Sequence, residues 1–154
     1  MENKNEVKIV SAIVCQSSLL DQQTNNISLL NVLEDVRFDI KIADAKADIS
    51  KGISLPFQFD FVVMFARSDT LKVEKELSFN GKVSLVSPEG IVLIDNPIQG
   101  VIEKGKKRFR MTIKFNGVKL TKSGVYVFRC SIFGTQKDNI QTSETPVDFV
   151  VNLS

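Results

Sequence analysis

The segment between Leu120 and Phe133 constrains the fold more than any other part of the chain. Tyr126 stands two residues after Gly124 and six residues after Leu120. This spacing is typical of the tyrosine corner of Greek-key β-sandwiches, in which the phenol hydroxyl bonds to a backbone group a few residues upstream. Because the chain holds a single tyrosine, we expect Tyr126 to fix the connection that leads into a strand over residues 125–133.

Alternating apolar side chains indicate extended strands along most of the remaining chain. The pattern is clearest from Phe57 to Phe65, where four phenylalanines and one valine occupy every second position. Side chains two residues apart share one face of a strand, whereas a helix would spread them around its surface. Such patterns predict strands over residues 7–15, 27–32, 34–42, 57–65, 71–79, 82–86, 91–94, 98–102, 107–115, 125–133 and 146–153.

Turn signals separate these strands. The polar run over residues 21–26 predicts a hairpin turn between the first two strands, because Asn and Asp tolerate left-handed conformations. Asn80-Gly81 predicts a tight hairpin, Pro88-Glu89-Gly90 another turn, and Asp95-Asn96-Pro97 a break in the chain. Residues 43–52 predict either one short helix that stops at Gly52 or a long loop. The eleven apolar runs correspond to about eight to ten strands, because neighbouring runs such as 27–32 and 34–42 can continue one another. Strands at this spacing predict an all-β, immunoglobulin-like Greek-key β-sandwich, a single domain over residues 1–154 with at most one short helix near 43–52.

Phenylalanine dominates the predicted core. The chain contains eleven phenylalanines and no tryptophan, and aromatic and β-branched side chains favour pleated, half-buried surfaces. The residues that we expect at the centre of the core are Phe59, Phe61, Phe65, Phe109, Met111, Tyr126, Phe128 and Phe149.

The N-terminal region and the two cysteines indicate a reducing compartment. The apolar run from Ile9 to Cys15 is interrupted by Ser11 and is followed by no small-residue cleavage pattern. No segment approaches the roughly 20 apolar residues that a membrane helix needs. We therefore expect a cytoplasmic protein with no membrane segment. Cys15 and Cys130 permit one disulfide between the sheets, but this compartment favours two buried thiols that act as small hydrophobic groups.

Histidine is absent from the chain. Its absence excludes Ser-His-Asp and Cys-His catalysis and zinc sites with histidine ligands. Glycine-rich phosphate loops and the calcium-loop pattern are also missing. The sequence therefore predicts no enzyme, no catalytic residue, no cofactor and no metal. The best acidic cluster, Glu34, Asp35 and Asp39, fits a solvated strand end better than a calcium site, because calcium takes about six to eight oxygen ligands.

A run of positive charge lies near the predicted strand 107–115. Residues 103–114 carry six cations and one acid, a local charge of +5, so the rest of the chain sums to −3. This run can dock phosphate or an acidic partner, or its cations can stop an edge strand from pairing with other sheets. Phe109 and Phe115 should point inward, which argues against nucleic acid because stacking platforms would be missing. We name five of the cations the basic strip: Lys106, Lys107, Arg108, Arg110 and Lys114.

Four segments carry a resemblance to known proteins, and they are Ser28-Leu29-Leu30-Asn31-Val32-Leu33, Leu55-Pro56-Phe57, Ser87-Pro88-Glu89-Gly90 and Ser123-Gly124-Val125-Tyr126-Val127-Phe128. Over residues 8 to 135 the chain resembles a family of small uncharacterised bacterial β-sandwich proteins, a domain of unknown function. Residues 41–54 look like an insertion relative to that family. The resemblance implies a β-sandwich and no particular activity.

These observations favour a non-catalytic binding or scaffold module that acts through an edge strand or loops. Its partner would be another protein or a second copy of the chain, and Val150 and Val151 in the last strand are candidates for such an edge. One alternative is a ligand-binding domain for an oxygen-ligated metal or a carbohydrate, although sugar sites usually expose Trp or Tyr. Another is a structural component of a phage or secretion assembly.

Overall fold

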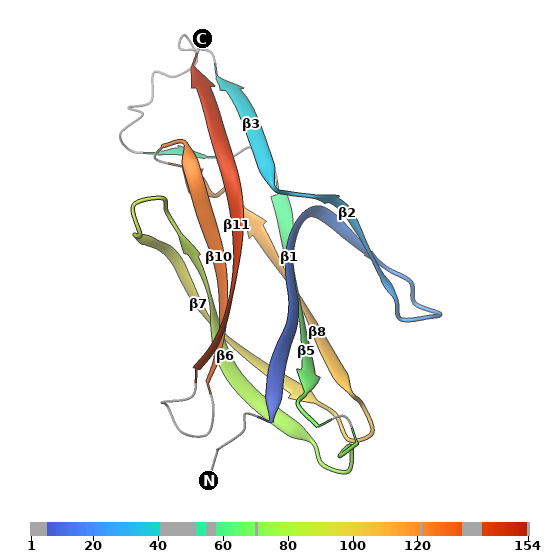
Figure 1. The fold of residues 1–154 in the computed structure, drawn as a ribbon. Coiled ribbons are helices and arrows are strands. Elements are labelled where there is room, and N and C mark those ends of the chain that lie inside the picture. Colours follow the sequence, from blue (N-terminus) through green and yellow to red (C-terminus); the bar gives the residue numbers. More distant parts are fainter. Residues whose placement is uncertain are drawn as a thin grey trace.

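Two β-sheets pack face to face in the computed structural model of the chain (Figure 1). The structure describes residues 6–40, 52–54, 58–69, 71–120, 122–133 and 140–153. Its strands are β1 (Val7–Leu20), β2 (Ile27–Val32), β3 (Asp35–Ile40), β4 (Ile53–Ser54), β5 (Gln58–Arg67), β6 (Leu77–Val86), β7 (Val92–Ile102), β8 (Arg108–Asn116), β9 (Lys119–Leu120), β10 (Gly124–Phe133) and β11 (Ile140–Leu153).

One sheet has the strand order β2-β1-β5-β8 and the other the order β3-β11-β10-β6-β7, while β4 and β9 form a separate pair. All neighbours are antiparallel except β3 and β11, which run parallel. The predicted all-β sandwich is confirmed. Its finer assignment to the immunoglobulin-like Greek-key class stays a prediction, and the short helix expected near 43–52 falls on residues that the structure does not describe, Gly52 excepted.

Aromatic side chains from both sheets fill the space between the layers. Phe59 of β5 packs edge-on against Phe128 of β10, with ring centroids 5.5 Å apart, and Tyr126 meets Phe149 edge-on at 5.4 Å. Edge-to-face contacts of this kind suit the charge distribution of aromatic rings. Six of the eight predicted central residues have no exposed surface. The other two, Phe109 and Met111, are half-buried against the core.

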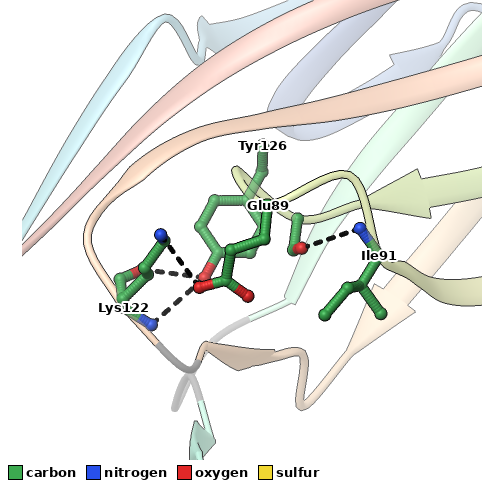
Figure 2. Close-up of polar contacts among 5 residues, drawn as sticks. Glu89, Ile91, Lys122 and Tyr126 are labelled. Carbon is green, nitrogen blue, oxygen red and sulfur yellow. Dashed lines mark hydrogen bonds and ion pairs between the residues drawn. The ribbon is translucent and has the colours of Figure 1, made fainter.

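The tyrosine corner is present. The Tyr126 hydroxyl donates to the Lys122 carbonyl at 2.8 Å, the upstream backbone contact that the sequence predicts. Figure 2 shows the phenol directed at Lys122, whose Nζ lies 2.9 Å from Glu89 Oε1 in the β6–β7 turn. Gly124 has a φ of 145°, and a Cβ there would lie 2.8 Å from Pro88 Cγ, so the site requires glycine. The corner and the Pro-Glu-Gly turn are thus joined.

The predicted hairpin at Asn80-Gly81 is wrong. Both residues lie inside β6, where Gly81 pairs with Ile98 of β7 and with Ile132 of β10. A Cβ on Gly81 would lie 2.2 Å from the Ser131 carbonyl oxygen. This glycine therefore permits a close approach of two backbones and forms no turn.

Several strand ends also differ from the sequence prediction. The expected break at Asp95-Asn96-Pro97 lies within β7, which tolerates proline because it is an edge strand and needs no N–H on its open side. The strand expected over 71–79 is present only from Leu77, where β6 begins, and residues 71–76 are not in a strand. Strand β11 begins at Ile140 instead of Pro146. β11 lies between β3 and β10, so Val150 and Val151 form no sheet edge.

Candidate functional site

The outer half of β1 leaves the sandwich together with β2. Strand β1 pairs with β5 only as far as Cys15, and beyond it β2 is its one partner among the strands that the structure describes. We call residues 16–32 the hairpin arm, and Figure 1 shows it standing out to one side of the two layers. Leu19 and Leu20 are 59% and 54% exposed, and Leu30 is 44% exposed. Since consecutive strand residues point to opposite faces, both faces of the arm carry exposed apolar groups.

The tip of the arm is a hydrogen-bonded turn that reaches strand β8. Oδ1 of Asp21 accepts the backbone N–H groups of Gln23 and Thr24 at 2.8 and 3.3 Å, which holds the pKa of this carboxyl below its usual range. Asn25 adopts a left-handed φ of 57°, as asparagine readily does in turns. Arg110 Nη2 then donates to the Asn25 carbonyl at 3.2 Å. The tip is therefore bound to β8, and the predicted polar turn is confirmed.

The basic strip lies at the edge of the first sheet. Among the described strands β8 pairs with β5 alone, and Arg108, Arg110 and Lys114 share one face of it because they lie an even number of residues apart. Lys106 and Lys107 lie in the exposed turn that precedes β8. The structure thus brings all five predicted residues to one edge.

A groove of about 710 Å³ separates the arm from β8. Four cations of the basic strip line it, together with one acid, Glu103; Lys107 lies outside it. Leu20 and Ile27 of the arm and Met64 of β5 supply apolar lining. Ser18, Asn25 and Asn26 of the arm also line it, so the groove combines a net positive wall with a wall of mixed polar and apolar side chains.

A buried carboxylate connects the arm to β8 beside the groove. Asp60 is 3% exposed and lies on the outer face of β5, opposite the core phenylalanines. Its two carboxylate oxygens accept from Ser18 Oγ at 2.8 Å and from Lys114 Nζ at 3.2 Å. Asp60 consequently fixes one cation of the basic strip and the base of the arm in relation to each other.

A buried arginine fixes the turn that carries the first residues of the basic strip. Arg67 is 1% exposed, and its guanidinium donates to backbone carbonyls alone among the described residues. Nε reaches Lys106 O at 2.7 Å, and Nη2 reaches Glu103 O at 3.0 Å. The remaining carbonyl acceptors are those of Lys72, Lys75 and Ile102. Arg67 thereby holds two loops together at one end of the sandwich.

The cysteines occupy different faces of the structure, and both are buried free thiols. Cys130 belongs to the core between the sheets, where burial raises its pKa to about 12. Cys15 pairs with Asp60 on the outer side of its sheet. Burial, followed by the charge of Asp60, raises the pKa of Cys15. Since the two side chains belong to different layers of packing, an inter-sheet disulfide would require the strands to move.

The acidic cluster at the start of β3 is exposed, as a solvated strand end should be. Asp35 pairs with Arg37 at 3.4 Å, and Asp39 accepts from Asn152 Nδ2 at 3.1 Å. Within the described ranges, no three Cys, Asp or Glu side chains gather as possible metal ligands. No helix in those ranges has the length and hydropathy needed to cross a membrane.

Sequence reasoning missed the arm, Asp60 and Arg67. The arm was hidden because Gln16 and two serines interrupt the apolar pattern of β1 before Leu19. Asp60 and Arg67 carried a signal, since each is a charged residue inside or at the end of the most apolar strand of the chain. A charge in such a strand needs a partner or a cage, because an unpaired buried charge is costly.

No protein-family model matches the chain, and no curated protein matches it. Among solved structures, the chain is similar to part of a β-glucosidase from Listeria innocua, determined in complex with glucose. The two share 10% sequence identity with a TM-score of 0.41, and the match covers 97% of this chain but 16% of the enzyme chain. A similarity at this level carries no argument about activity.

Proposed function

We propose that this protein is a non-catalytic binding or scaffold module, and that the hairpin arm is where its protein partner binds. The observation that carries the proposal is the exposure of apolar side chains on both faces of the arm. Leu19, Leu20, Leu30 and Val32 are all at least 44% exposed. Single exposed apolar residues are ordinary, but a contiguous group on a projecting ribbon is typical of an interaction site.

The edge position of β2 adds a second reason. β2 ends the strand order of its sheet, so one side of its backbone is open for pairing with a partner strand. Exposed edges are commonly protected by charged residues or proline, whereas β2 reads Ile-Ser-Leu-Leu-Asn-Val. A partner that covers this edge would bury its apolar side chains. The proposal includes no catalytic step and no cofactor, and it places the protein in the cytoplasm on the sequence arguments alone.

Two measurements on matched variants test this function. The arm variant is Leu19→Ser/Leu30→Ser, and the control variant is Leu71→Ser/Ile91→Ser, which changes two residues that are 88% and 57% exposed outside the arm. We expect wild type and control to retain the same protein from native lysate, or to form the same oligomer in light scattering, and the arm variant to lose it. A monomer whose retained proteins are identical in all three forms would refute the proposal.

A further inference from the structure

We infer that the groove between the arm and β8 binds an extended acidic segment of the partner protein, with its carboxylates on the basic strip. This inference rests on the proposed function, because it assigns the chemistry of the partner that the arm would hold. It adds a second contact, on the opposite wall of the same groove.

Charge is the first argument. Four cations and one acid line the groove, and residues 103–114 carry a local charge of +5 in a chain whose remainder sums to −3. Two of these cations already have partners, since Lys114 bonds to Asp60 and Arg110 to the Asn25 carbonyl. Lys106 and Arg108 form no ion pair within the described part of the chain. These two are available to carboxylates from outside.

Shape is the second argument. Arg108, Arg110 and Lys114 of the lining lie at even-numbered positions of β8, on the same face as Met64 of β5, which pairs with Arg110. The groove therefore runs along the outer face of the edge strand, with its cations at every second position. An extended segment fits such a site because its own side chains alternate. Acidic residues at every second position would meet the cations, while the residues between them would face Leu20 and Ile27 of the arm.

The contacts of Arg110 distinguish this role from simple protection of a sheet edge. Cations that only prevent another strand from pairing with the edge need to be exposed. Their side chains can stay mobile and still prevent that pairing. Arg110 is instead held at the tip of the arm, and Lys114 is held by a carboxylate that is 3% exposed. Ordering long side chains costs conformational entropy. That cost is better explained by a groove whose two walls must be in place when a ligand reaches the unpaired cations Lys106 and Arg108.

The probe is a short fluorescein-labelled peptide in which Glu alternates with Val, compared with the same peptide carrying Lys in place of Glu. The charge variant is Lys106→Gln/Arg108→Gln. Its control is Lys82→Gln/Lys119→Gln, which removes the same charge from β6 and β9. Fluorescence anisotropy should show that the Glu peptide binds wild type and control alike, and that the charge variant binds it about tenfold more weakly. Added salt should weaken the wild-type binding, since exposed charges are screened.

Three outcomes would overturn the inference: equal binding of the Glu and Lys peptides, equal binding by the charge variant and its control, or tighter binding of a single-stranded oligonucleotide than of the Glu peptide. The partner retained from lysate separates this failure from failure of the proposed function. If the arm variant loses that partner while the charge variant keeps it, the arm binds and the acidic segment is wrong. If neither variant changes what is retained, the proposed function itself fails.

Discussion

Strand β1 passes through two different environments along its length. Its inner half pairs with β5, and there Val14 faces the second sheet with no exposed surface, whereas Val10, at the bulge between Ile9 and Ser11, is 51% exposed. Its outer half pairs with β2 and with no other described strand, and there Leu19 and Leu20 are 59% and 54% exposed. Both halves carry apolar side chains in extended backbone. The difference is that a second layer covers the inner half, and no described part of the chain covers the outer half.

This difference shows which apolar residues the fold explains. Full burial of a leucine stabilises a protein by about 1.5–3 kcal/mol, so the inner half of β1 has a reason inside the molecule. An isolated two-stranded ribbon is at best marginally stable, and exposed leucines add little to it. The arm therefore depends on Asp60 and Arg110 for its position. Its leucines are best explained by a surface outside this chain.

The largest loss of stability is expected from a substitution in β5 opposite the inner half of β1. Phe61 pairs with Val14 and has no exposed surface. Phe61→Ala should lower the free energy of unfolding by about 3–5 kcal/mol, because it removes buried surface and leaves a cavity. Urea unfolding followed by circular dichroism measures the change. Leu20→Ala is the control and should cost no more than about 0.5 kcal/mol; equal costs would abolish the distinction between the two halves.

Arg67 should have the next largest effect, because it lies beside Val7 at the covered end of β1. Arg67→Ala leaves five buried or part-buried carbonyls without their donor and should lower the free energy of unfolding by about 2–4 kcal/mol. Arg67→Lys should recover part of this loss. Arg129→Ala, which breaks a partly exposed pair with Glu144 at 3.0 Å, should cost less than about 1 kcal/mol. If Arg67→Ala lowered the free energy of unfolding by less than about 1 kcal/mol, water would be replacing the guanidinium as the donor to these carbonyls.

Alkaline unfolding tests how completely the layers cover Cys130. Its pKa is raised to about 12 in the folded protein from an ordinary value of 9.0. Above pH 9 the unfolded chain therefore releases this proton while the folded chain keeps it, so stability falls from about pH 9 to about pH 12. Below pH 9 the thiol is protonated in both states and adds no pH dependence. Cys130→Ala should unfold with a shallower pH slope in urea titrations at about pH 8 and about pH 10.

Turn-forming sequences predicted the structure correctly in some parts of the molecule and wrongly in one. Turn chemistry correctly located Pro88-Glu89-Gly90 and the tip of the arm, and period-two patterns located the core strands. Asn80-Gly81 misled because its glycine serves the close approach of β10, a tertiary contact that no local pattern contains. The identical dipeptide Asn116-Gly117 does end a strand, with a φ of 64° at its glycine.

The candidate site was half predictable for a related reason. The cations of the basic strip are close in sequence, so their density alone indicated an edge, and β8 is an edge. The other wall of the groove comes from residues 18–27. The sequence of the basic strip does not indicate that these residues lie beside it. Asp60 joins the two walls through Ser18 and Lys114, contacts that depend on strand order. Strand order was beyond the reach of periodicity and turn signals.

The tyrosine corner should contribute less than the core around it. Tyr126→Phe keeps the packing against Phe149 and removes the hydroxyl that donates to Lys122 O at 2.8 Å. We expect a loss of about 1 kcal/mol, since the freed carbonyl is near enough to the surface to meet water. Lys122→Gln, which keeps that backbone contact and breaks the exposed pair with Glu89, should cost about half as much or less. Chemical denaturation measures the free energy of unfolding of the two variants. If Lys122→Gln lost more stability than Tyr126→Phe, the tyrosine corner would not be one of the contacts that stabilise the sandwich.

The smallest expected effect completes the comparison by making one type of change in both halves of β1. Leu19→Ser/Leu30→Ser in the arm should alter the free energy of unfolding by no more than about 0.5 kcal/mol, because these residues are already 59% and 44% exposed. Val14→Ser should cost at least about 2 kcal/mol, since it loses buried apolar surface and adds a buried hydroxyl. Thermal and urea unfolding of the two variants give the difference directly. If the arm variant lost as much stability as Val14→Ser, the arm leucines would be serving the fold of this chain. Any loss of binding in that variant would then say nothing about a partner surface.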